Sequence, residues 1–409
     1  MSVSSEHAPA PEAKAPEKGA APSRWTTALR DMASSSATVI IFAILGALIL
    51  AAVLIAAADP TVQKTAGYIF ARPADFFKAV WDSVSGAYSA LFRGAIYNPD
   101  AATFARKIKP ITETLTAATP LIFAGLGLGI GFRSGIFNIG AQGQVVLGAV
   151  VSAYFGFAFN LPVVLHLIVA IIGGFLAGGL WAGIAGFLKA RFGANEVIVT
   201  IMLNSIAGFL MSYLLTTTAF MRPGSNNPVS QRVADTAMFP KLLGQDFRLH
   251  WGFVLALLAA VAVWWLMERS VLGYRFRAVG FNPDAARTAG IKVERMYLYV
   301  MLVAGGLAGM GGVSQTLGTE GVLQEGVAGS IGFDAITVAL LGRSRPAGIV
   351  GAAILFGALR AGSPLMQTDS NTPIDIVQVV QALVVLLIAA PPLVRAIFRL
   401  PVPLKEVAA

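Results

Sequence analysis

The chain has 409 residues, of which 56% are hydrophobic and only 12% are charged, and its mean hydropathy is +0.72. Charge this sparse, together with 43 Gly and 21 Pro, indicates a polytopic α-helical membrane protein. The net charge of +9 does not point to nucleic acid, because Lys and Arg in loops orient membrane spans. The lack of cysteine excludes disulfides, thiolate metal sites and cysteine nucleophiles.

The N-terminal part divides into a tail, a span and a long loop. Residues 1–37 are rich in Ala, Pro, Ser and Lys and cannot bury a core, so we expect a disordered tail. The apolar run 38–58 is too long, and begins too late, for a cleaved signal peptide, so we interpret it as the first span. In loop 59–111, apolar residues recur at near-helical spacing over 73–92, which predicts an amphipathic helix on the outer membrane face.

Ten apolar segments are candidate spans. They are 38–58, 112–131, 139–159, 163–188, 196–217, 252–267, 294–317, 330–342, 347–361 and 374–390, of which the eighth is short. With the tail inside, the inner loops carry 18 Lys and Arg, whereas the outer loops carry 5 when the long loop is left aside. The excess of inner positive charge places both termini in the cytoplasm.

Ten spans divide into two sets of five, and an odd number per half permits an inverted repeat, a common plan in transporters. Both halves contain a polar, Gly-rich break, "GFRSGIFNIGAQGQ" (131–144) and "GTEGVLQEGVAGSIGFDA" (318–335). We therefore expect two inverted five-helix halves, with a solute pathway near their interface.

The loop 268–293 is unusual because six Lys and Arg lie in and just after it, from Arg269 to Arg295, between two spans. By the topology above it faces the cytoplasm. Within it, Asn282 is a good N-cap, Pro283 suits a first helical turn, Asp284 complements the positive helix end, and Gly290 suits a C-terminal stop. The pattern predicts a very short helix that must dock on something. It either lies on lipid headgroups or inserts into a groove of a cytoplasmic partner.

Three motifs resemble one family of membrane proteins. "AVGFNPDAARTAGI" (278–291) is similar to the coupling-helix loop of ABC importer permeases. "GFRSGIFNIGAQGQVVLGA" (131–149) and "NEVIVTIMLNSIA" (195–207) resemble the nucleoside and simple-sugar branch of the branched-chain amino acid/ribose permease superfamily. The resemblance covers about 110–395 and implies the ten-helix plan of type II ABC importers.

The resemblance also implies which residues contact an ATPase. They are Gly280, Asn282, Pro283, Asp284, Ala285, Ala286, Arg287 and Gly290. The small alanines suit close packing in a groove, and Arg287 is able to pair with an acidic residue of the partner.

Polar groups inside apolar spans usually face a bundle interior or a cavity, because lipid cannot satisfy them. The candidate pathway residues are Phe137, Asn138, Gln142, Gln144, Asn204 and Asp334. Asn and Gln both donate and accept hydrogen bonds, which suits ring edges or sugar hydroxyls. The alternative for the amides is hydrogen bonding between helices. For Asp334, and for Glu320 in the same segment, the alternative is a position in a solvated loop.

No phosphate-binding loop, metal-ligand cluster or catalytic set is evident in the sequence. We therefore predict a transport subunit without catalytic, cofactor or metal-binding residues. The resemblance implies a multi-pass permease domain (38–397) of the bacterial inner membrane, with a cytoplasmic tail at 398–409. Its implied partners are a separate ATPase, an extracytoplasmic solute-binding protein, membrane lipid and a second permease chain, the last as a heterodimer. The alternatives are a stand-alone carrier or channel, and a scaffold without transport activity.

Overall fold

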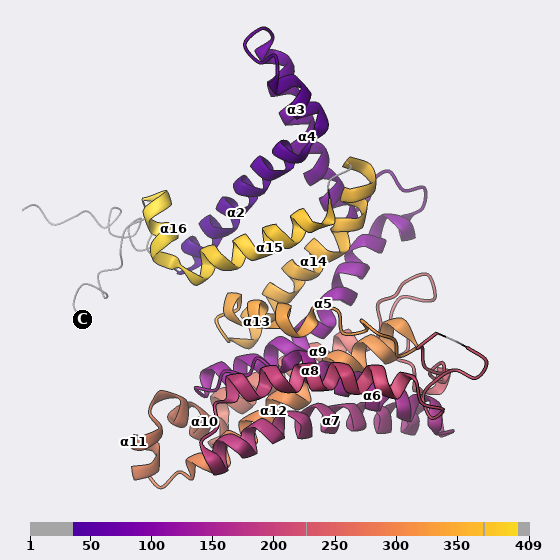
Figure 1. The fold of residues 1–409 in the computed structure, drawn as a ribbon, viewed down its shortest axis with the longest axis vertical. Coiled ribbons are helices and arrows are strands. Elements are labelled where there is room, and N and C mark those ends of the chain that lie inside the picture. Colours follow the sequence, from indigo (N-terminus) through magenta and orange to yellow (C-terminus); the bar gives the residue numbers. More distant parts are fainter. Residues whose placement is uncertain (1–35, 226, 371–372, 400–409) are drawn as a thin grey trace, which may run out of the picture.

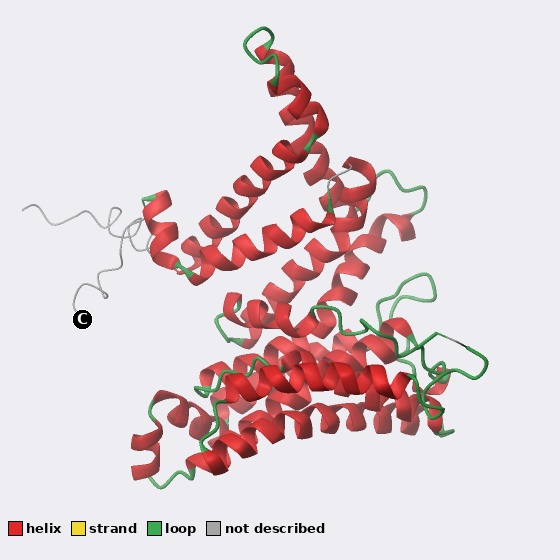
Figure 2. Ribbon diagram, viewed as in Figure 1, coloured by secondary structure: helices red, strands yellow, loops and turns green. Residues whose placement is uncertain are grey.

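The computed structural model describes residues 36–225, 227–370 and 373–399. Within these residues the chain is helical, and β pairing is limited to isolated bridges in loops (Figure 2). The predicted tails at 1–37 and 398–409 lie almost wholly outside the described residues.

Eight of the described helices are long and apolar enough to cross a membrane. They are α2 (Ser36–Ala58), α5 (Phe104–Arg133), α6 (Ala141–Ala158), α7 (Val163–Phe192), α8 (Glu196–Leu215), α9 (Gly252–Arg269), α12 (Val293–Ser314) with its π-helical continuation η2 (Gln315–Glu320), and α14 (Pro346–Ser370). Each coincides with a predicted span. The predicted spans 330–342 and 374–390 coincide with shorter helices, α13 (Ile331–Leu341) and α15 (Ile374–Ala389).

The remaining helices connect or flank the spans. They are α3 (Pro60–Ala66), α4 (Pro73–Ala95), the 3₁₀ turn η1 (Asp235–Ala237), α10 (Val271–Phe281), α11 (Pro283–Thr288) and α16 (Pro391–Phe398). The helix expected over 73–92 is therefore present as α4. It packs on α14 where the two helices expose small residues: a Cβ on Gly94 would lie 3.0 Å from the Gly362 Cα.

The centre of the molecule is built around α12, which packs closely against α5, α6 and α7. Small residues allow this approach, because side chains between two helices would hold their backbones apart. The crossing of α7 and α12 shows the effect: a Cβ on Gly178 would come within 2.4 Å of the Gly305 carbonyl oxygen. Residue size, more than hydrophobicity, therefore decides which helices form the core.

The helices form a bundle of α6–α9 and α12, with α5, α13 and α14 leading to a second group of α2, α4 and α15 (Figure 1). The pair α10 and α11 projects from one end of the bundle. The end of α16 lies toward the same side of the molecule, and the connection between α8 and α9 lies at the opposite side.

Candidate functional site

The short helix predicted in the charged loop is present as α11, and its ends have the expected chemistry. The Asn282 Oδ1 accepts hydrogen bonds of 3.0 Å from two backbone N–H groups of the first turn. After the helix, Gly290 adopts a φ of +82°, which favours glycine, and its N–H donates to the Arg287 carbonyl. Local sequence signals therefore suffice to set where this helix begins and ends.

A second helix, α10, precedes α11 and was not predicted from the sequence. Gly280 lies in α10 and faces the body of the protein: a Cβ there would come within 2.5 Å of the Arg133 carbonyl oxygen at the end of α5. Gly280 therefore allows α10 to pack against α5, and its position in the structure faces away from a partner.

The tip formed by residues 281–290, which we call the peg, has an inner and an outer face. Ala286 is only 4% exposed and packs inward, whereas Pro283, Asp284 and Ala285 are exposed. Sequence analysis missed Phe281, whose side chain is 95% exposed. A large aromatic residue in a charged loop, directly before an N-cap, is the signal that points to it, since exposed aromatic side chains often anchor protein interfaces.

Ion pairs within the chain hold the peg together and join its base to neighbouring helices. Arg287 pairs with Asp284 at 3.2 Å and with Glu294 at 2.9 Å, so its charge already has partners without a second protein. Glu268, at the end of α9, pairs with Arg133 of α5 and Arg277 of α10, both at 2.7 Å. The Glu268 pairs join the ends of α5, α9 and α10 next to the peg.

The predicted pathway amides at the start of α6 form a closed hydrogen-bonded cluster. Asn138 and Gln144 bond to each other twice, at 3.0 and 2.9 Å, and the Asn138 Oδ1 also accepts from the Gly140 N–H. Both side chains are 1% exposed. They have little capacity left to bind a solute.

The other two amides join α6 to its neighbours. Gln142 donates to the Gly329 carbonyl at 2.7 Å and accepts from the Gly332 N–H at 2.8 Å, which ties α6 to the start of α13. Asn204 of α8 accepts from the Gly143 N–H and donates to the Ile139 carbonyl. We call Asn138, Gln142, Gln144 and Asn204 the amide junction, and its geometry is that of helix-to-helix bonding.

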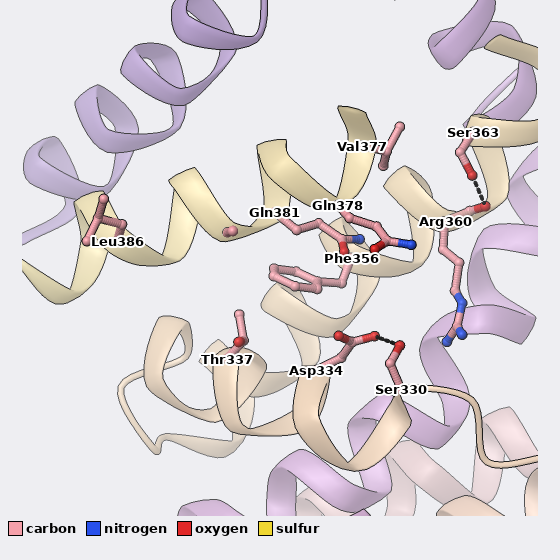
Figure 3. A pocket seen from close by; sticks show the side chains of 11 residues that line it. Ser330, Asp334, Thr337, Phe356, Arg360, Ser363, Val377, Gln378, Gln381 and Leu386 are labelled. Carbon is pink, nitrogen blue, oxygen red and sulfur yellow. Dashed lines mark hydrogen bonds between the residues drawn. The ribbon is translucent and has the colours of Figure 1, made fainter. Parts of the chain in front are cut away.

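Asp334 is the one predicted pathway residue that lines a large cavity, of about 790 Å³ between α13, α14 and α15 (Figure 3). We call it the central cavity. Its lining residues are Ser330, Asp334, Thr337, Phe356, Arg360, Ser363, Val377, Gln378, Gln381, Ala382 and Leu386. Phe137 lies elsewhere, half-exposed beside Phe132 with ring centroids 5.4 Å apart.

The polar groups of the central cavity are mostly unused. The Asp334 Oδ2 accepts from the Ser330 Oγ at 2.8 Å. Among the described residues, the side chains of Gln378 and Gln381 make no hydrogen bond within the protein, and the Arg360 guanidinium forms no ion pair. The cavity therefore offers amide, carboxylate, hydroxyl and guanidinium groups beside the Phe356 ring, a set that binds polar rings.

Sequence reasoning missed Arg360, Gln378 and Gln381, although signals existed. Arg360 interrupts the apolar segment 347–361, and the two glutamines stand three residues apart in 374–390, hence on one helix face. Elsewhere in the described chain, no group of three or more His, Asp or Glu is arranged to hold a metal ion.

Comparison with known proteins gives one family model and several relatives. Residues 111–389 match the family described as branched-chain amino acid transport system / permease component. The chain is 38% identical to a guanosine ABC transporter permease protein of Bacillus subtilis, over 75% of this chain and 86% of that protein. It is 36% identical to a glucose ABC transporter permease protein of Haloferax volcanii, over 68% and 75%. It is 35% identical to a nucleoside ABC transporter permease protein of Lactococcus lactis, over 69% and 79%. No solved structure matches the chain.

Proposed function

Because the chain belongs to the branched-chain amino acid transport system permease family, and is thus a multi-pass permease subunit of an ABC importer, we propose that it carries a nucleoside or a simple sugar inward. The central cavity is the observation that carries this proposal. Its unpaired amides, its carboxylate and its hydroxyls match the donors and acceptors of a base edge or a sugar. The relatives named for guanosine, nucleosides and glucose support the same solute class.

We place the coupling to ATP hydrolysis at the peg. The sequence has no G-x-x-x-x-G-K-[ST] loop, so the nucleotide is hydrolysed on a separate ATPase subunit. The exposed face of the peg, with Phe281, Pro283, Asp284 and Ala285, is the surface that enters a groove of that subunit. Gly280 and Ala286 support this surface from within the chain, and Asn282, Arg287 and Gly290 hold its ends.

The orientation follows from the positive charge of the loops. Charge counting puts the peg in the cytoplasm, and the end of α16 lies toward the same side of the molecule (Figure 1). We therefore assign both termini to the cytoplasm and the connection between α8 and α9 to the outer side, with α13 and α15 as the ninth and tenth spans. In a bacterium this membrane is the inner membrane.

Reciprocal contacts support two inverted halves, α2 with α5–α8 and α9 with α12–α15. In each half the second span packs on the fourth span of the other half, as α5 does on α14 and α12 does on α7. Likewise α6 packs on α12 and α13 packs on α5, and the pairs α6–α8 and α13–α15 correspond. Transporters with this symmetry bind solute near the interface of the repeats.

The complete importer needs further subunits. We infer an extracytoplasmic solute-binding protein that delivers the solute, and a second permease chain that forms a heterodimer with this one. The rival function, a stand-alone carrier or channel, would move solute without an ATPase.

Uptake by the complete importer tests the proposal. Cells that express all subunits should accumulate labelled guanosine or glucose, and a catalytically dead ATPase subunit should abolish this uptake. Uptake that persists with the dead ATPase would favour the carrier or channel. Transport of neither solute would overturn the assigned class.

The peg is tested separately by replacing exposed residues. Asp284→Lys and Ala285→Trp should abolish both uptake and co-purification of the ATPase, because they change the charge and the size of the docking surface. The side chains at both positions face solvent, so neither change fills a packed core. Ala286→Trp is not a clean test, since Ala286 is buried and its replacement would disturb the fold. Thr288→Ala, an exposed change at the far end of α11, serves as the control for membrane insertion. Normal uptake in both peg variants would contradict this assignment.

A further inference from the structure

A second cavity of about 400 Å³ adjoins the central cavity, and Arg360 lines both. It lies between α5, η2, α14 and the loop before α9. Its polar lining residues are Glu113, Thr116, Arg248, Gln315, Thr319, Glu320 and Arg360. By the topology proposed above, it lies in the outer half of the spans, where a solute that enters from outside is able to reach it.

The polar groups of the second cavity are incompletely paired. The Glu113 Oε1 and the Thr319 Oγ1 are buried without a hydrogen-bond partner among the described residues. The ion pairs that Arg248 makes are long, 3.5 Å to Glu113 and 4.0 Å to Glu320. A buried oxygen without a partner is costly to leave unsatisfied, so this cavity favours a ligand that supplies hydrogen-bond donors.

The lining also specifies the kind of ligand. Two carboxylates and two guanidiniums balance in charge, which favours neither an anion nor a cation. Ala117, Pro120, Ala361 and Pro364 supply apolar surface beside the polar groups. A neutral ring with hydroxyl groups on its rim and C–H groups on its faces fits both parts of the lining. Carboxylates accept from such hydroxyls, and guanidiniums donate to them.

The π-helical segment η2 holds three of the lining side chains in place. Its backbone is fixed from the outer loop, because Phe239 N–H donates to the Leu317 carbonyl at 2.9 Å and Lys241 Nζ donates to the Gly318 carbonyl at 3.0 Å. Single π turns inside α-helices occur frequently at functional sites. Here the wider turn presents Gln315, Thr319 and Glu320 to the cavity while the backbone stays bonded.

We propose that the second cavity is a reception site for the hydroxyl groups of the sugar part of the solute, with Glu113 and Thr319 as the residues that bind them. The solute then passes Arg360 into the central cavity. This inference rests on the proposed function, because it needs a solute that contains a sugar.

The test compares each solute with an analogue that lacks hydroxyls. Uptake by the complete importer is measured for guanosine against 2′,3′-dideoxyguanosine and for glucose against 2-deoxyglucose. The pair whose parent is transported gives a discrimination ratio. In Glu113→Gln and Thr319→Val this ratio should fall by about tenfold, the effect of roughly one lost hydrogen bond. Thr319→Ser, which keeps the hydroxyl, should preserve the ratio.

A matched control is Glu325→Gln, the same chemical change on an exposed residue outside the cavity, which should leave the ratio unchanged. An unchanged ratio in Thr319→Val, with uptake intact, would overturn the inference and leave the proposed function standing. An equal loss of uptake for the parent and its analogue would also overturn it, because the cavity would then be only a passage. If neither parent solute is transported, the proposed function itself fails, and the reception site fails with it. If Glu113→Gln does not assemble, the Thr319→Val and Thr319→Ser pair decides alone.

Discussion

The amide junction and the central cavity occupy corresponding places in the two proposed halves, yet one is closed and the other open. The junction lies where α6 starts against α8, and a Cβ on Gly140 would lie only 2.8 Å from the Thr200 Cβ. The cavity lies where α13 starts against α15 and holds about 790 Å³. The two regions adjoin, because Gln142 of the junction bonds to Gly329 and Gly332 beside the cavity's Ser330, so a packed region and an open region meet where the proposed halves meet.

The difference between the two regions shows that polar residues within spans are of two kinds, those already bonded within the chain and those left free. Gln142 and Gln381 are the same residue type in the two proposed halves, but Gln142 uses both ends of its amide to bond backbone groups, whereas Gln381 makes no hydrogen bond among the described residues. Saturated amides hold helices together, and unsaturated amides beside a cavity are free to bind a solute. Of the following changes, Asn138→Leu and Gln381→Leu should each affect one region and spare the other.

The largest effect is expected from opening the junction. Asn138→Leu removes the partner of a 1% exposed Gln144 side chain and leaves the Gly140 N–H unpaired. Unpaired buried groups of this kind cost about 3 kcal/mol or more in sum. The thermal unfolding midpoint of the purified chain should fall by several degrees, and less folded protein should be recovered. An unchanged midpoint would show that the junction does not hold the fold.

Acidification should weaken the outer side and leave the junction unaffected. Burial, followed by the nearby charges of Lys241 and Arg248, lowers the pKa of His250 to about 4, below its ordinary value of 6.5. An unfolded chain thus binds more protons than the folded one between these values. The stability that neutral His250 contributes is therefore complete above pH 6.5, and about 3 kcal/mol is lost as the pH falls toward 4.

The measurement is the unfolding midpoint between pH 7 and pH 4. Removing the imidazole in His250→Gln should flatten this dependence, whatever the absolute stability of the variant. The comparison variant is His166→Gln. His166 lies in α7, away from His250, and bonds to Thr236 at 2.7 Å. A steep pH dependence that survives in His250→Gln would assign the effect to other groups.

A smaller effect, confined to transport, is expected at the cavity. Gln381→Leu removes an amide that has no partner in the chain, so the unfolding midpoint should stay within about a degree of wild type, while uptake should fall about tenfold through one lost hydrogen bond to the solute. The contrast with Asn138→Leu is the point of this variant. A large loss of stability would mean that Gln381 is a structural residue like those of the junction.

The smallest effect is expected at the Glu268 ion pairs, which join α10, at the base of the peg, to α5 and α9. Arg277→Gln breaks the 2.7 Å pair with Glu268, whose carboxylate keeps its bond to Arg133. Partly exposed pairs contribute little, so stability should change by less than about 1 kcal/mol. ATP-driven uptake should fall by severalfold while the ATPase still co-purifies, because the peg still docks but is less firmly joined to α9. Loss of the ATPase from the complex would instead place Arg277 in the docking surface.

Local signals in the sequence predicted the elements that depend on neighbouring residues. The Asn282 cap, the Pro283 start and the Gly290 stop fix α11 without reference to the rest of the fold. Apolar runs of spanning length likewise located eight helices that are long enough to cross a membrane. These features depend on periodicity and capping, which a single sequence contains.

Contacts between distant segments could not be predicted in this way. Gly280 belongs to the same motif as Asp284, yet only the approach of α5 shows that Gly280 faces inward. Asn204 resembles a pathway residue until its two bonds to the start of α6 are seen. The sequence shows which side chains are polar, and the fold decides which of them remain available.

Cysteine accessibility in the two regions tests the account most directly, because the chain contains no cysteine of its own. Thr337→Cys places a thiol in the central cavity, and Thr200→Cys makes the same change beside the junction. In the assembled importer without ATP, a water-soluble maleimide should label Thr337→Cys at least about tenfold faster, and saturating transported solute should slow only that labelling. Faster labelling at Thr200→Cys, or no protection of Thr337→Cys by solute, would contradict the assignment of the central cavity as the solute path.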